Sequence, residues 1–166
     1  MLLNWLREVA PGKYEDHDDV MILVHDDGDV SSFYKRVKNE DISALPDSIR
    51  PIYQYYDGID LFTNAFQIAA FNRSVEIEGK KVICSLGELA EICRDIKFPE
   101  PTVPFMLEYA DMEGNQWIYA AAVNSDKIYC FDTRDEVFDV YESVEEIIGG
   151  WLDDTAEENR RDGIEF

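Results

Sequence analysis

The chain has 166 residues, a length that suits one domain spanning 1–166, and no apolar run approaches the roughly 20 residues that cross a bilayer as a helix. It carries 36 acidic against 15 basic side chains, a net charge of −21, which argues against binding to nucleic-acid phosphates or anionic membranes. If charge selects a partner, that partner is basic; alternatively, the acidity serves only solubility.

The N-terminal segment predicts a short amphipathic helix over residues 1–10, which Pro11 and the following glycine stop. Residues 13–19 are polar and predict a loop. The apolar run 20–24 predicts a buried strand, and a turn follows over 25–29. Because the first residues include an early acid and no long apolar region, they are unlike a secretion signal, and we expect a cytoplasmic protein.

Acidic residues gather at both ends of the strand 20–24, and each group includes a histidine, His17 or His25. A calcium loop needs oxygen ligands at alternating positions and a distal glutamate, and neither group has that spacing. A five-residue strand also holds its two ends about 16 Å apart. We therefore expect solvated acidic loops and no metal site.

Residues 30–44 contain apolar and aromatic side chains at helical spacing, among them Val30 and Phe33, and predict a helix. The same segment holds the one notable basic cluster, which we interpret as a solvated face: Lys35, Arg36 and Lys38.

The stretch 45–66 predicts a short helix, a glycine stop and an apolar strand. Ser48 can cap the helix, and Pro51 falls in its first turn. Proline is tolerated there because the N–H groups of the first turn have no hydrogen-bond partner within the helix. Gly58 suits a left-handed C-terminal cap. Apolar positions at spacings of three and four share one face of this helix: Ile49, Ile52, Tyr53 and Tyr56.

The middle of the chain predicts a bent strand or two short strands over 60–71, and then a hairpin over 75–83. Ser85 and Glu88 have the spacing of a capping box, so a helix begins there and buries Cys93. A Pro-Glu-Pro segment at 99–101 ends this unit.

The C-terminal half predicts four short strands, over 103–110, 116–123, 128–132 and 137–141. Short strands joined by short turns imply an antiparallel meander. A second capping box begins at Ser143 and opens a helix that two glycines weaken. We expect the strongly acidic tail 153–166 to fray.

The sequence has no GxSxG, no HExxH and no phosphate-binding glycine loop. Both histidines lie in acidic loops, and no spacing pairs either with a cysteine nucleophile. Three cysteines without a CxxC pair argue against a disulfide framework or a zinc site and indicate reduced thiols: Cys84, Cys93 and Cys130. We therefore expect a protein that is not an enzyme and uses no cofactor or metal.

Several features, in this order, resemble the SUKH superfamily of fungal cell-wall-assembly regulators and bacterial toxin-immunity proteins. They are the Leu45-Pro46 pair, an aromatic helix followed by Asp57-Gly58, a turn holding Glu108, Asp111 and Gly114-Asn115, a strand ending at Asp132, and a helix from Ser143 to Trp151-Leu152. The likeness covers about 43–152. It leaves an N-terminal extension, 1–42, and the acidic tail, 153–166.

The resemblance implies an α+β fold with a single antiparallel sheet and flanking helices, and a binding module rather than an enzyme. In bacterial members the implied role is to bind and neutralise a toxin, often a nuclease, and such toxins carry cationic surfaces. We expect an immunity protein for a basic toxin domain. The alternatives are a regulatory scaffold without a toxin partner and, third, a metal-dependent or small-molecule enzyme.

The expected partner contacts are acids in loops: Asp16, Asp18, Asp19, Asp26, Asp27, Asp29, Asp111 and Glu113. Another set of residues is interpreted as structural: Leu45, Pro46, Tyr53, Tyr56, Asp57, Gly58, Trp117, Asp132 and Trp151.

Overall fold

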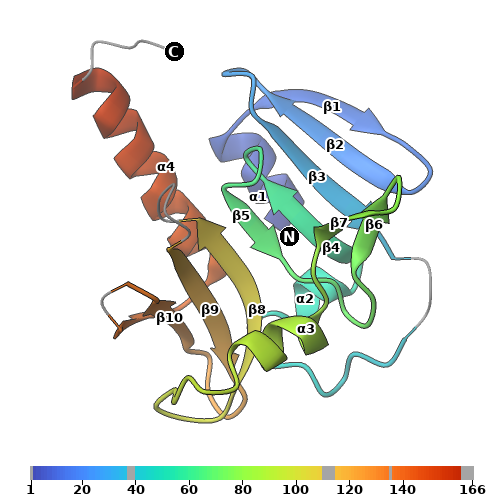
Figure 1. Ribbon diagram of the computed structural model, residues 1–166. Helices are drawn as coiled ribbons and strands as arrows, with labels where there is room; N and C mark the ends of the chain where they lie inside the picture. The colour runs from blue at the N-terminus through green and yellow to red at the C-terminus, as the bar shows by residue number, and fades with distance from the viewer. Residues whose placement is uncertain (1, 37–39, 110–114, 135, 162–166) are drawn as a thin grey trace.

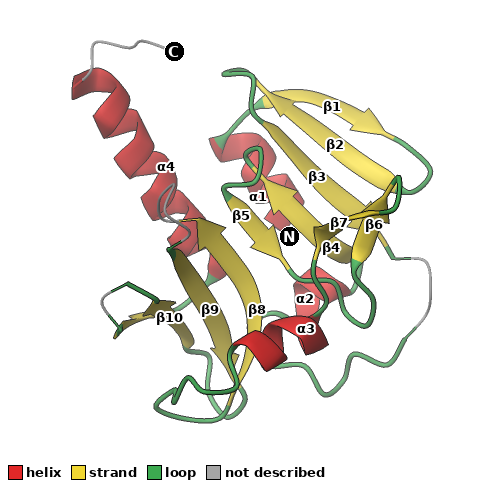
Figure 2. Ribbon diagram, viewed as in Figure 1, coloured by secondary structure: helices red, strands yellow, loops and turns green. Residues whose placement is uncertain are grey.

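The computed structural model describes residues 2–36, 40–109, 115–134 and 136–161. Its fold is α+β, as predicted, with one antiparallel sheet of nine strands and a separate sheet of two (Figure 1). The large sheet has the order β1-β2-β3-β4-β5-β8-β9-β10-β11. Figure 2 shows the strands as the main body of the molecule, with helices at its margins. The sequence predicts a single sheet, so the separate two-stranded sheet was not predicted.

Five strands form the N-terminal part of the large sheet: β1 (Gly12–Asp16), β2 (Val20–His25), β3 (Val30–Lys35), β4 (Tyr56–Leu61) and β5 (Phe66–Ile68). Strand β2 confirms the predicted strand, but of residues 20–24 only Leu23 is buried and the others are half-buried. The loop predicted over 13–19 is wrong, because its first residues form the edge strand β1, in which only Tyr14 is half-buried. The segment 60–71 resolves into two short strands separated by a turn.

The helix predicted over 30–44 is also wrong, because its first residues form β3. Ser31 and Phe33 both face the core, so burial alternates with a period of two residues, as in a strand. The apolar pattern does not show this period because one of the buried residues, Ser31, is polar. Lys35 pairs with Asp16, and Arg36 donates to the Tyr53 carbonyl. Lys38 lies outside the described residues.

The helix of the stretch 45–66 is a single turn, α2 (Arg50–Tyr53). Ser48 does not cap it: Ile49 occupies the cap position, and the Ser48 Oγ has no hydrogen-bond partner among the described residues. Gly58 has a φ of +100° but lies within β4 rather than at a helix end, since the chain passes from the helix almost directly into the strand.

The segment after β5 forms a hairpin, β6 (Val75–Ile77) and β7 (Lys80–Ile83), and then α3 (Leu86–Ile92). The predicted capping box is confirmed. The Ser85 Oγ accepts from the Glu88 backbone N–H at 3.2 Å, and the Glu88 carboxylate accepts from the Ser85 N–H at 3.3 Å. In Figure 2 the hairpin lies at the right of the view, and α3 lies below it near the lower centre.

The predicted C-terminal meander is confirmed as β8 (Thr102–Tyr109), β9 (Gln116–Ala122), β10 (Ile128–Asp132) and β11 (Val137–Tyr141). Helix α4 (Val144–Arg161) follows, with the Ser143 Oγ accepting from the Glu146 N–H. The prediction that the chain frays from 153 is wrong up to 161, because the acids lie on a helix whose first turns are packed on the sheet. Residues 162–166 lie outside the description.

One hydrophobic cluster joins the sheet to both terminal helices. Helix α1 (Leu2–Val9) contributes Leu2, Leu3 and Leu6, and α4 contributes Ile147 and Ile148. The two helices also contact each other. In Figure 1, α1 lies behind the N-terminal strands, and α4 runs beside the C-terminal strands and extends beyond them. This placement leaves the face of β8–β11 next to α4 only partly covered.

Candidate functional site

Strand register sets the floor of a groove between the C-terminal strands and α4. Glu108 on β8 is paired with Trp117 on β9, and Trp117 with Asp132 on β10. One row further along, Tyr119, Cys130 and Asp139 are paired across β9, β10 and β11. Because side chains two positions apart in a strand share a face, both rows point to the same side of the sheet.

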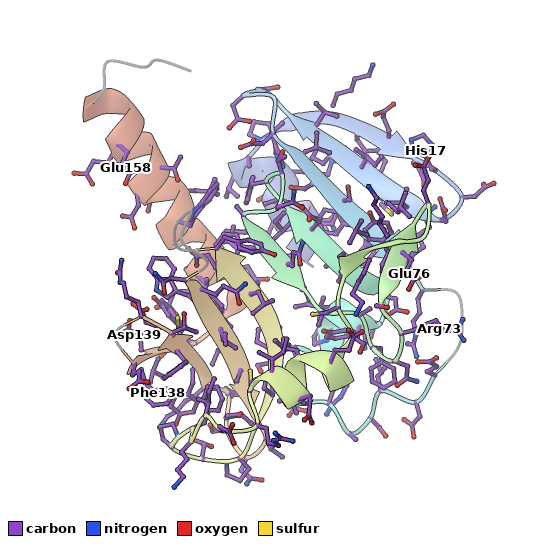
Figure 3. All side chains as sticks on the ribbon, viewed as in Figure 1. His17, Arg73, Glu76, Phe138, Asp139 and Glu158 are labelled. Carbon is purple, nitrogen blue, oxygen red and sulfur yellow. The ribbon has the colours of Figure 1, made fainter. Side chains whose placement is uncertain are left out.

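Helix α4 forms the wall opposite this floor. Glu146, Gly150, Asp154 and Glu158 recur every four residues, so they lie on one helical face, and all of them line the groove. Trp151 anchors the helix. Its ring stacks on Phe62 with the centroids 4.8 Å apart, and it meets Phe66 edge-on with the centroids 5.6 Å apart. Figure 3 shows Glu158 on α4 and Asp139 among the C-terminal strands.

The groove has a volume of about 450 Å³, and the charged residues in its described lining are all acidic. Its carboxyl groups come from four strands or helices: Glu108, Asp132, Asp139, Glu146, Asp154 and Glu158. No lysine, arginine or histidine is among the lining residues in the described ranges. Asp139, Asp154 and Glu158 are exposed, and their carboxylates make no hydrogen bond or ion pair with other described residues. The groove therefore concentrates negative potential.

Glu108 lies at the bottom of the groove, with 5% of its surface exposed. Its Oε1 accepts a hydrogen bond from the Tyr119 hydroxyl at 2.5 Å. Burial raises the pKa of the Glu108 carboxyl to about 7; the Tyr119 hydrogen bond opposes this shift, and the Asp154 carboxylate adds to it. Near neutral pH this carboxyl is therefore divided between its two protonation states.

Aromatic rings complete the walls of the groove: Tyr109, Trp117, Tyr119, Tyr141 and Trp151. Tyr109 is exposed, and Trp117, Tyr141 and Trp151 are half-buried. Ring faces attract cations, and they attract them more strongly where water is excluded. Carboxylates and ring faces in one concave site are the chemical groups that recognise an organic cation.

The acidic residues expected to bind a partner lie elsewhere. The structure places Asp16, Asp18 and Asp19 at one end of β2 and Asp26, Asp27 and Asp29 at the other, so β2 separates the two groups as predicted. None of the six lines the groove. Asp27 accepts from the Asp29 N–H, and the pKa of Asp29 is raised by burial and by Asp27. Asp111 and Glu113 lie outside the described residues.

The acidic turn after β2 is nevertheless linked to the groove wall. His25 is buried rather than in an exposed loop, and its Nδ1 donates to the Ala10 carbonyl at 2.7 Å. Ser31 Oγ lies 2.7 Å from the His25 Nε2. The His25 ring also lies 4.8 Å from the ring of Phe62, the residue that stacks on Trp151.

Six residues interpreted as structural lie in or near the core. Leu45, Pro46, Tyr53 and Tyr56 are buried, and the Tyr53 hydroxyl donates to the Ala69 carbonyl at 2.6 Å. The Asp57 carboxylate accepts from the Phe71 N–H at 2.6 Å. A Cβ on Gly58 would lie 3.2 Å from a methyl carbon of Val75. The other three residues line the groove: Trp117, Asp132 and Trp151.

A second groove, of about 590 Å³, lies between the hairpin β6–β7 and the outer face of β2 and β3. Its floor is apolar, and its rim carries both charge signs, among them Asp19, Glu76 and Arg73. Figure 3 shows Arg73 and Glu76 on the opposite side of the view from Asp139 and Glu158. Across the described ranges, no group of three or more His, Cys, Asp or Glu side chains is arranged to hold a metal ion.

Sequence reasoning missed Glu108, Tyr119, Asp139, Asp154 and Glu158 as site residues. Glu108 did carry a signal, because it is an acid within the apolar run of a predicted strand, where a charge is costly to bury. The acidic residues of α4 carried a weaker signal, which is their spacing of four residues. Only the strand register shows that Glu108 and these acidic residues line the same groove.

Comparison of the chain with protein-family models, curated proteins and solved structures found no match. No helix in the described part of the chain is long and apolar enough to cross a membrane.

Proposed function

We propose that this protein is a binding module that holds a basic protein partner in the acidic groove between β8–β11 and α4. The observation that carries the proposal is the groove lining, which combines six carboxyl groups with aromatic walls and, in the described ranges, no basic side chain. A partner with clustered lysine and arginine would find both charge complementarity and ring faces there.

The protonation of the groove residues supports binding over catalysis. Burial raises the pKa of the Cys130 thiol to about 12, so the thiol is not a nucleophilic thiolate. Burial and Glu108 likewise raise the pKa of Tyr119 far above the usual range for tyrosine. The Glu108 carboxyl could exchange a proton near neutral pH, but neither Cys130 nor Tyr119 beside it is an activated nucleophile.

Within this proposal, the partner we favour is a toxin domain of the nuclease type. Such a domain must carry a cationic surface to hold phosphates, and a protein of net charge −21 can cover that surface. The resemblance of the sequence to the SUKH superfamily supports the same role. We propose that the protein acts in the cytoplasm, where reduced cysteines are the ordinary state.

The test compares three forms of the full chain as bait for proteins from the native cell. The wild type is matched with a groove variant, D139N/D154N/E158Q, and with a surface variant, D95N/D126N/D153N. All six substituted residues are exposed, and their carboxylates have no hydrogen bond or ion pair to the described residues; each variant removes three negative charges. Captured proteins are eluted with rising salt and identified.

We expect the wild type and the surface variant to retain the same basic protein, and the groove variant to lose it. The purified partner should then bind the groove variant at least about tenfold more weakly, because each lost interfacial charge contact costs on the order of 1 kcal/mol. Equal binding by all three forms would show that the groove is not the interface. Retention of housekeeping proteins instead would favour the scaffold alternative.

A further inference from the structure

Glu108 has one carboxylate oxygen engaged and one available. Its Oε1 accepts from the Tyr119 hydroxyl, whereas no described residue donates to its Oε2. The Oε2 atom is not among the buried side-chain atoms that lack a partner in the described ranges, so it is open to the groove and not sealed in the core. Because Glu108 lines the groove, the donor can arrive from there.

The surroundings of Glu108 favour an ammonium group on an alkyl chain over a guanidinium group. A guanidinium pairs best with a carboxylate through two parallel hydrogen bonds, one to each oxygen. The Tyr119 hydroxyl already uses one of the two acceptor sites of Oε1, so a bidentate guanidinium would have to share that oxygen with it. An ammonium donates single hydrogen bonds and needs only Oε2. Its alkyl stem can lie along the half-buried rings of Trp117 and Trp151.

We propose, on the basis of the function proposed above, that the groove receives one lysine side chain of the partner and that Glu108 is the anion that binds its ammonium. The exposed carboxylates at the mouth, Asp139, Asp154 and Glu158, then face the partner surface around that lysine. Glu108 is thereby the residue that selects lysine over arginine at this position.

Binding of an ammonium to Glu108 requires its ionised form, so the affinity is linked to pH. The titratable groups that line the groove with Glu108 from the sheet are Tyr109, Tyr119, Cys130, Asp132, Asp139 and Tyr141. Those that face it from α4 are Glu146, Asp154 and Glu158. Burial raises the pKa of the Glu108 carboxyl to about 7, so the ammonium should bind more weakly as pH falls below that value.

The experiment uses the full chain with Nα-acetyl-lysine N-methylamide as probe, a capped lysine with one positive charge. The Glu108 carboxyl is followed by carbon NMR as pH is raised, without and with the probe. We expect the probe to lower the midpoint of this titration by about one unit, which corresponds to tenfold tighter binding to the ionised form. This readout needs no variant.

Variants and probe analogues supply the controls. Glu108→Gln should weaken probe binding about tenfold, whereas Asp153→Asn, which removes one charge from α4 outside the groove, should change it less than twofold. The equivalent capped arginine should bind more weakly than the capped lysine.

An unmoved Glu108 midpoint, or arginine bound as tightly as lysine, would overturn the assignment of Glu108. Cadaverine bound a hundredfold more tightly than the capped lysine would identify a free diamine as the occupant, and would overturn it too. These results would leave the proposed function standing if D139N/D154N/E158Q still loses the partner. If D139N/D154N/E158Q binds the partner as tightly as the wild type does, the proposed function itself is contradicted.

Discussion

At the scale of single residues, Glu108 shows how a site can be built at the expense of stability. Its neighbours on β8, Phe105, Met106 and Leu107, are buried apolar side chains that the sheet needs. Glu108 lies next to them with a folded-state pKa of about 7, above its ordinary value of 4.5. The folded protein therefore binds this proton more tightly than the unfolded chain does.

We predict a pH dependence of stability that Glu108→Gln removes. The contribution of Glu108 is fully present below pH 4.5 and is lost as pH rises to about 7, because the buried carboxyl must then ionise. The free energy of unfolding of the wild type should fall relative to the variant by about 2 kcal/mol between about pH 5 and pH 8. Urea denaturation of both proteins across this range measures it. A constant difference would show that Glu108 titrates normally.

At the scale of helices and strands, α4 combines features that oppose and support a helix. Gly149 and Gly150 lower its intrinsic stability, and Asp154 and Glu158 repel each other one turn apart. Ile147, Ile148 and Trp151 compensate by packing against the core. A basic partner in the groove would relieve the repulsion, so binding should stabilise the second half of α4.

We predict that Gly149→Ala and Gly150→Ala each stabilise the free protein by about 0.5–1 kcal/mol. A Cβ at position 149 would make an ordinary contact with the Trp5 ring, 3.8 Å away, and one at 150 would meet nothing within 4 Å. Thermal and chemical denaturation measure both variants. Destabilisation by either substitution would mean that the helix needs a glycine there for another reason.

Prediction from sequence succeeded where local signals agree. The strands of 102–141 are bounded by turns, and α3 begins at a capping box, so both were predictable. It failed at β3 because Ser31 is buried by its contact with His25 and with the Phe62 N–H, which breaks the apolar alternation. It failed at β1 because an exposed edge strand needs no apolar pattern. The groove depends on pairing partners distant in sequence, which no local signal encodes.

At the scale of the whole molecule, the charge of −21 acts on folding and binding in opposite directions. Self-repulsion destabilises the folded chain, while the same field attracts a basic partner. Salt screens both effects. Stability and affinity should therefore respond to ionic strength with opposite sign.

We predict that raising NaCl from about 10 mM to about 0.5 M increases Tm by about 3 °C, equivalent to about 1 kcal/mol. Scanning calorimetry measures this change, and D95N/D126N/D153N should show a smaller rise because it carries less charge. Partner affinity should fall over the same range. A Tm that falls with salt would indicate that attractive ion pairs, such as Lys35 with Asp16, outweigh the repulsion.

The junction between β5 and β8 gives the groove a place in the order of folding. Among the described strands of the large sheet, every other neighbouring pair is consecutive in the chain, whereas this one spans 69–101. Such a contact closes a long loop and is slow to form. Phe66, which packs on Trp151, is paired there with Glu108. We therefore expect the floor and the wall of the groove to form in a late folding step, so that a partly folded chain would have no groove to bind a partner.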